Sequence, residues 1–208
     1  MLDDQWLPDD QKQALNESYE ALLKNYSAET LQEPGDIERV AQNSLILKSY
    51  RDADIKNVFK LQGRSNSFYV LTVEITYEIV TQGKYRTDRR EIRELHLLGM
   101  VPLPVDLGRV FIRPESLADK VSELFAAKEV DFSKHREFSQ KYYVLADNPA
   151  SIQRSFSKEF MDGILNLKNV VLEISGKSLL VGILKIIDPG DVLRIASFLD
   201  KAPDQMIS

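Results

Sequence analysis

The alternation of apolar and polar side chains is clearest between residues 68 and 80. Large apolar residues occupy every second position there, and threonine and glutamate fill most of the positions between them. A period of two is typical of a strand with one buried face and one solvated face. A turn at residues 81–84 and a second extended run at residues 85–98 predict a long antiparallel hairpin. In this hairpin, arginines of the second strand lie within reach of Glu74 and Glu78.

Four other segments carry apolar residues at helical spacing. Each begins with proline next to acidic or asparagine residues, which provide caps and a backbone angle suited to a first helical turn. These segments predict helices at residues 9–26, 114–128, 147–165 and 188–199.

Shorter apolar runs predict further strands at residues 110–112, 141–146, 169–174 and 178–187. Residues 101–104 include two prolines, which lack amide hydrogens, so this segment is expected at a sheet edge or in an extended crossing. Residues 27–39 are polar and contain Glu33-Pro34-Gly35-Asp36. They are expected to form a linker, and a short helical turn after it is an alternative that the sequence leaves undecided.

This order of elements predicts an α+β fold, an antiparallel β-sheet with helices packed on it, whose second half reads βαββα. We expect an N-terminal helix and linker at residues 1–40, an α+β domain at residues 41–200, and a flexible tail at residues 201–208. A sub-boundary near residues 128–138 is left open, since the two parts can share one core.

Composition narrows the setting of the chain. Its 208 residues are 43% hydrophobic and include no cysteine, so the chain can fill a core but cannot form disulfides or use thiol chemistry. No apolar run approaches the roughly 20 residues that span a bilayer, and the N-terminus is acidic where a secretory signal would be basic. These features predict a soluble, cytoplasmic protein, with a peripheral position at the membrane as the alternative.

Charge and edge patterns bear on partners. A net charge of −5 opposes sequence-independent binding to nucleic acid. A protein partner or a second copy of the chain is left open, because the prolines of residues 101–104 can leave an exposed sheet edge. Membrane association is a further alternative, drawn from Trp6, the amphipathic helix at residues 9–26 and the arginine-rich strand.

Imidazole chemistry has two candidates, His96 and His135. His96 alternates with leucines in a predicted strand, where a structural role is favoured. His135 lies in a polar loop between a predicted helix and a strand, and with Asp131 and Glu137 it forms the set of catalytic candidates. Their spacing matches no known metal site, and the sequence has no G-x-S-x-G nucleophile motif. A structural, solvated turn is the simpler interpretation.

Arg113 and Glu115 are the candidates for ligand binding, because they lie where a strand is predicted to meet a helix. An ion pair made by Arg113, to Glu115 or another acid, is the simpler interpretation. The glycine-rich phosphate loops of dinucleotide-binding and P-loop proteins are absent. We therefore expect no cofactor and no metal.

Three segments resemble an uncharacterised family of bacterial proteins of unknown function. They are IRPE at residues 112–115, VDFSKHREFS at residues 130–139 and KYYVLAD at residues 141–147. The resemblance covers about residues 59–199. It implies no activity, cofactor or catalytic residue, and it implies that relatives can carry a hydrophobic segment at the N-terminus.

Three function hypotheses follow. The leading one is a non-enzymatic binding or scaffold domain, because no specific catalytic motif occurs in a chain with well-defined structural elements. The alternatives are a peripheral membrane-associated domain and a hydrolase that uses His135 and nearby carboxylates.

Overall fold

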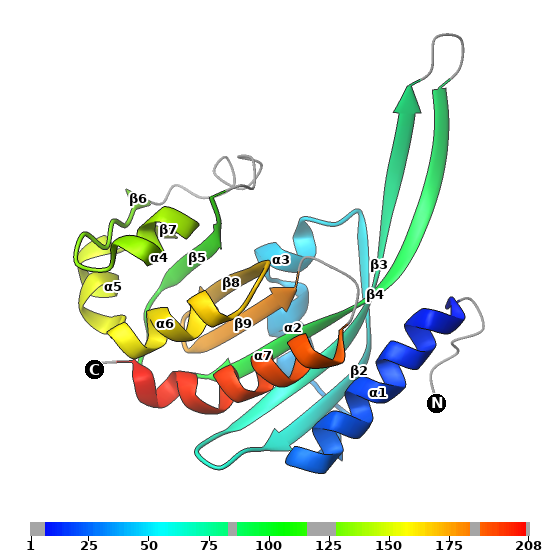
Figure 1. Cartoon of the computed structure of the whole chain (residues 1–208), viewed down its shortest axis with the longest axis horizontal. Coiled ribbons are helices and arrows are strands. Elements are labelled where there is room, and N and C mark those ends of the chain that lie inside the picture. The colour runs from blue at the N-terminus through cyan, green and yellow to red at the C-terminus, as the bar shows by residue number, and fades with distance from the viewer. Residues whose placement is uncertain (1–6, 83–86, 116–127, 184–187, 207–208) are drawn as a thin grey trace.

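The computed structural model describes residues 7–82, 87–115, 128–183 and 188–206. Within these ranges, nine strands form one sheet in the order β1-β2-β3-β4-β9-β8-β5-β7-β6, and all neighbouring strands are antiparallel (Figure 1). The strands are β1 (Ser27–Thr30), β2 (Asp52–Gln62), β3 (Ser67–Gln82), β4 (Thr87–Pro102), β5 (Arg109–Pro114), β6 (Lys128–Glu129), β7 (Tyr142–Ala146), β8 (Val170–Ser175) and β9 (Ser178–Ile183).

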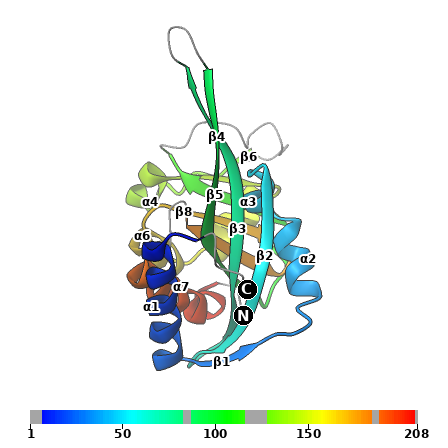
Figure 2. The same ribbon diagram turned by 90° about the vertical axis from the view of Figure 1, so that its right-hand side faces the viewer.

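Helices cover both faces of the sheet (Figure 2). The larger core lies beneath α1, α4, α5, α6 and α7, and the smaller one lies beneath α2 and α3. The helices are α1 (Asp9–Asn25), α2 (Asp36–Gln42), α3 (Leu45–Lys48), α4 (Arg136–Lys141), α5 (Pro149–Ser155), α6 (Lys158–Asn166) and α7 (Pro189–Lys201). The predicted α+β class, with helices packed on an antiparallel sheet, is confirmed.

The period of two in β3 places alternate residues in two cores, not in core and solvent. Phe68 and Val70 belong to the larger core, whereas Leu71 and Val73 belong to the smaller one. The expectation of one wet face is therefore wrong for the first half of this strand. It fails because α1 and α7 cover the face that carries Phe68 and Val70, and the sequence pattern of β3 carries no information about them.

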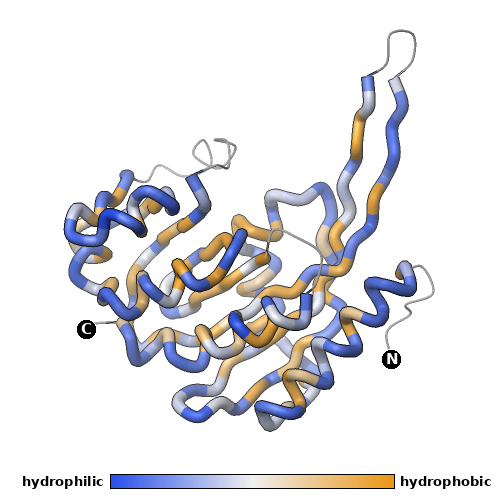
Figure 3. Tube along the Cα trace, viewed as in Figure 1, coloured by the Kyte–Doolittle hydropathy of each residue, from blue (hydrophilic) through white to orange (hydrophobic). Residues whose placement is uncertain are grey.

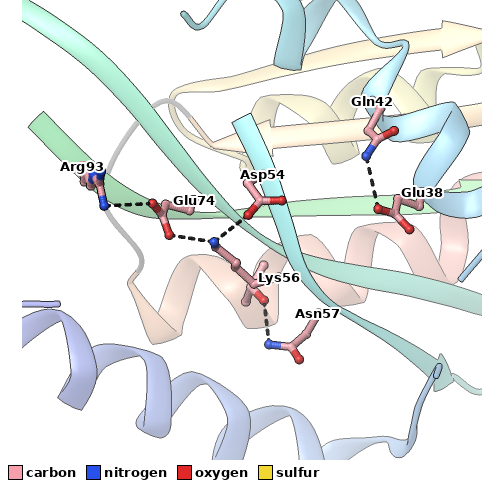
Figure 4. A network of polar contacts seen from close by, with 8 residues as sticks. Glu38, Gln42, Asp54, Lys56, Asn57, Glu74 and Arg93 are labelled. Carbon is pink, nitrogen blue, oxygen red and sulfur yellow. Dashed lines mark hydrogen bonds and ion pairs between the residues drawn. The ribbon is translucent and has the colours of Figure 1, made fainter. Parts of the chain in front are cut away.

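The predicted hairpin is present as β3 and β4, whose register runs without interruption from Tyr69↔Met100 to Gln82↔Thr87. Cross-strand ion pairs form as expected, from Arg93 to Glu74 at 3.9 Å and from Arg89 to Glu78 at 3.6 Å. Figure 4 shows Glu74 also accepting from Lys56 of β2, at 2.9 Å. The outer part of the hairpin extends beyond the remaining strands (Figures 1 and 3).

Two expectations about extended segments need correction. The polar stretch 27–39 is not only a linker, because Ser27–Thr30 pairs with β2 as β1 and Asp36–Gln42 forms α2. Val101 and Pro102 do not form an edge, because they pair with β9 in the interior of the sheet. Proline is tolerated there because pairing with β3 ends at Met100, so its missing amide hydrogen faces a side without a ladder partner.

Two predicted helices also differ from the structure. Residues 147–165 form two helices, because Phe156 leaves the helical conformation and the Ser157 side chain accepts from Phe160 N and starts α6. Pro114 ends β5 instead of starting a helix. The remainder of the helix predicted for residues 114–128 falls mostly outside the described residues. The polar loop near His135 also contains the short helix α4.

The tail is packed through Met206, contrary to its predicted flexibility. Helix α7 extends to Lys201 and continues into the 3-10 helix η2 (Ala202–Gln205), and Ala202 and Met206 are buried in the larger core. Met206 also forms a β-bridge with Phe156. Among the described residues, no helix is long and apolar enough to cross a membrane.

Candidate functional site

A pocket of about 680 Å³ lies beside the N-terminal ends of α4 and α6. Its apolar base comes from Phe132, Phe156 and Met161, each less than a tenth exposed. The two phenylalanine rings stack in parallel with centroids 5.7 Å apart, and Phe138 packs edge-on against Phe132. The size and the aromatic base are typical of small-molecule sites.

The loop that forms the rim of the pocket is fixed by hydrogen bonds from neighbouring elements. The Ser139 hydroxyl accepts from Phe132 N at 3.0 Å, and Gln153 of α5 donates to the carbonyl of Asp131 at 2.7 Å. His135 N donates to Phe132 O at 2.7 Å and closes a tight turn before α4. These bonds hold the rim residues over the aromatic base.

His135 lines the pocket and pairs with a carboxylate that sequence analysis missed. Its Nε2 lies 2.9 Å from Asp162 Oδ1, and its side chain is 12% exposed. Asp162 belongs to α6, 27 residues away in sequence. No sequence motif links the two residues, because their proximity results from packing of α4 against α6.

Three cations surround the pocket, Lys134, Arg136 and Lys158. All three are exposed, and within the described part of the chain none of them makes a hydrogen bond or an ion pair. The acids on the rim are Asp131, whose side chain also has no such partner, and Glu137, which binds Lys141 at 2.9 Å. Unpaired charge at the rim is therefore mainly positive.

The catalytic candidates Asp131, His135 and Glu137 thus line one pocket, but the ligand-binding candidates Arg113 and Glu115 do not. The Arg113 guanidinium is buried, lies 4.6 Å from the centre of the Tyr143 ring and donates to Pro114 O at 3.3 Å. Glu115 is exposed, and its backbone N–H donates to Lys141 O at 2.9 Å.

His96 belongs to a separate polar cluster where the outer hairpin leaves the body. Its Nε2 lies 3.2 Å from Glu94 Oε2, its Nδ1 lies 3.3 Å from Ile183 O, and Glu94 accepts from the Tyr77 hydroxyl at 2.8 Å. Burial and the adjacent Glu94 raise the pKa of Tyr77 to about 12. With both ring nitrogens of His96 near acceptors, this cluster fits the structural role expected for His96.

Two buried carboxylates hold backbone groups in place. Glu173 accepts from Leu45 N at 2.6 Å and from Ile46 N at 3.2 Å at the start of α3, and burial raises its pKa. Asp200 accepts from three consecutive N–H groups of the β2–β3 turn. Among the described residues, no group of three or more histidine, aspartate or glutamate side chains could hold a metal ion.

Comparisons with known proteins give one likeness of fold. No family model matches the sequence, and no curated protein matches it. The crystal structure of the mycobacterial trehalose monomycolate transport factor A, TtfA, superposes with a TM-score of 0.50, over 91% of this chain and 93% of that chain, at 10% sequence identity. At this identity the likeness bears on the fold alone.

Proposed function

We propose that the protein is a non-enzymatic binding domain whose ligand site is the pocket at His135, and that the ligand is a small anion with an aromatic or apolar body. The observation that carries the proposal is the position of Lys134, Arg136 and Lys158 around an aromatic base, each of them without a hydrogen bond or ion pair to any other described residue. A cationic rim attracts an anionic group, and the apolar base removes the body of the ligand from water.

The positive charge at the rim of the pocket favours an anionic ligand over a cationic one. The chain as a whole has a net charge of −5, so a rim whose unpaired charge is mainly positive among the described residues differs in sign from the whole chain. Within the part of the chain that the structure describes, Glu137 of the two rim carboxylates is paired and Asp131 is not, which leaves a positive excess for a ligand to neutralise.

A fluorescent anion of this class, 1-anilinonaphthalene-8-sulfonate, tests the proposal. We expect saturable binding at one site per chain, weakened about tenfold by Lys134→Ala or Lys158→Ala, since each removes a charge-assisted contact. Lys168→Ala is the matched control, because Lys168 is also exposed but does not line the pocket. The uncharged counterpart N-phenyl-1-naphthylamine should bind all variants equally.

Equal affinity of wild type and both pocket variants for the sulfonate would contradict the proposed site. Thermal unfolding of each variant, monitored by circular dichroism, separates a lost contact from a lost fold, because this dye also binds partly unfolded proteins.

A hydrolase is the second candidate, because the Asp162 carboxylate can orient the His135 ring as in catalytic histidine–carboxylate pairs. Among the described residues, no hydroxyl group lies within hydrogen-bond distance of that ring, so the nucleophile of a serine hydrolase is not in place. Hydrolysis of p-nitrophenyl esters or phosphates that His135→Ala abolishes and His96→Ala retains would replace the binding proposal with this one.

The peripheral membrane hypothesis has less support from the packing. Its amphipathic helix, α1, buries Leu15 and Leu22 in the larger core, and Tyr19 packs on Phe59 with centroids 5.0 Å apart. A helix that lies in a lipid interface needs its apolar face free. Trp6 lies outside the described residues. Flotation with anionic vesicles is the direct test of this alternative.

A further inference from the structure

The outer part of the β3–β4 hairpin forms a two-stranded arm, which consists of Tyr77–Gln82 and Thr87–Ile92. Pairing of β2 with β3 ends at Asp52↔Thr76, so the arm strands pair only with each other among the described residues. Figure 1 shows the arm extending away from the body. An isolated two-stranded hairpin is marginally stable in water, and both of its edges expose unpaired backbone groups.

The longer open edge belongs to β4. Pairing of β4 with β9 begins at Leu98↔Gly182 and runs toward Pro102, so the earlier residues of β4 have no strand on this side within the described chain. Leu103 N donates to Lys177 O on the β9 side. Because β4 keeps one register against β3 without a bulge, amide groups of alternate residues, including Glu91 and Arg93, point to the same open side.

We propose that this edge pairs with the same edge of a second copy of the chain, antiparallel and centred on Ile92. Two identical antiparallel strands related by a two-fold axis place one residue opposite itself, so each register is defined by its central residue. Two arginines lie opposite each other when the register is centred on Arg89, Arg90 or Arg93. Two glutamates lie opposite each other when it is centred on Glu91. Like charges in direct opposition are destabilising.

The register centred on Ile92 avoids this repulsion. It places Ile92 opposite Ile92 of the second copy, Glu91 opposite Arg93, and Arg90 opposite Glu94. By symmetry each opposite-charge pair occurs twice. Glu91 and Arg93 have half-exposed side chains, 50% and 54%, so they are accessible to a partner. The edge is therefore complementary to itself in the register centred on Ile92.

A cysteine placed on the two-fold axis tests the register directly, because the native chain contains no cysteine. Opposed residues of a non-hydrogen-bonded antiparallel pair have Cα atoms about 4.5 Å apart, within the range of disulfides. Under mild oxidation, Ile92→Cys should form a covalent dimer. Ile79→Cys is the matched control, because Ile79 is 45% exposed on the same arm but lies on β3, away from the axis.

Sedimentation of the full chain tests the charge pairing without cysteine. Arg93→Glu turns two opposite-charge pairs into like-charge pairs and should raise the dimer dissociation constant about tenfold. Arg89→Glu makes the same charge change on the same strand. Because residue 89 lies opposite Leu95 of the second copy, this variant should change the dimer dissociation constant less than twofold.

Three results would overturn the proposal. One is a wild-type chain that stays monomeric at every concentration tested. Another is faster crosslinking of Ile79→Cys than of Ile92→Cys, which would indicate collision or pairing through β3. The third is a monomer that floats with phosphatidylglycerol vesicles through the arm, which would indicate a lipid surface instead. Binding of the anionic dye at His135 is independent of all three, so the two proposals can fail separately.

Discussion

Replacement of Asp200 should destabilise the protein strongly, although the side chain has no role in the pocket. Its carboxylate is 7% exposed and accepts from Arg64 N at 3.1 Å, Ser65 N at 3.0 Å and Asn66 N at 2.9 Å. Asn66 also donates from its side chain to Asp200 O at 2.7 Å. The residue thereby joins the C-terminal end of α7 to the turn between β2 and β3.

The magnitude follows from the number of bonds. Asp200→Ala removes the acceptor of three backbone donors, and at about 1 kcal/mol for each net hydrogen bond the loss is about 3 kcal/mol. Asp200→Asn can keep its carbonyl oxygen where Oδ1 lies, against Ser65 N and Asn66 N, and loses only the bond to Arg64 N. We expect Asp200→Asn to lower the unfolding free energy by about 1 to 1.5 kcal/mol.

Equilibrium unfolding in urea measures both variants, with Asp204→Ala as the control. Asp204 is exposed and accepts one long hydrogen bond, from the Asn66 side chain at 3.3 Å, so its loss should cost less than about 0.5 kcal/mol. Amide hydrogen exchange at residues 64–66 should accelerate in Asp200→Ala before other amides do. An unfolding free energy of Asp200→Ala equal to that of Asp204→Ala would refute the reasoning.

Three further predictions concern Gly63, Glu173 and Tyr142. A methyl group on Gly63 would overlap the Asp200 carboxylate, so Gly63→Ala should destabilise the wild type more than it destabilises Asp200→Ala, as a double-mutant cycle in urea would show. Burial raises the pKa of Glu173 above its usual 4.5, so the folded state holds this proton more tightly than the unfolded state does. The stabilisation that this group contributes is complete below pH 4.5 and is lost as the pH rises through the pKa of the folded state. Unfolding at several pH values should therefore show the unfolding free energy of Glu173→Gln rising relative to that of wild type as the pH passes through this range. The Tyr142 hydroxyl donates to Leu167 O at 3.0 Å. Tyr142→Phe removes this bond and should lower the unfolding free energy by about 1 kcal/mol, as thermal or urea unfolding would measure.

The parts of the fold that sequence predicted best are those set by local chemistry. The caps at Asn148 and Asp188 accept the expected backbone hydrogen bonds, from Ser151 N and Asp191 N. The β3–β4 hairpin follows from alternation and a turn within one continuous stretch. These features depend on neighbours close in sequence, and their residue types have few other conformations to adopt.

Strand β2 could not be identified in the same way, because a register shift interrupts its alternation. The shift lies between Ile55 and Asn57, so buried and exposed positions change phase within the strand. Strand β1 is short and polar, and its place at the sheet edge follows only from pairing with β2. The polar composition that suggested a linker is equally suitable for an edge strand.

The candidate site shows the same division between local and tertiary information. The sequence predicted a structured polar segment around His135, and the pocket forms there. Asp162 and Lys158 were not found, because both come from α6 and approach His135 only when that helix packs against α4. A single sequence contains many carboxylates and lysines, and only the fold selects among them.

The fold also separates charges that it uses from charges that it leaves available. Glu173 and Asp200 accept hydrogen bonds from backbone N–H groups of distant segments, and Glu74 pairs with Lys56 and Arg93, so the fold itself uses these acids. Lys134, Arg136 and Lys158 have no such partner among the described residues. We propose that a ligand completes this arrangement, because a cationic rim above an aromatic base suits an anion with an apolar body.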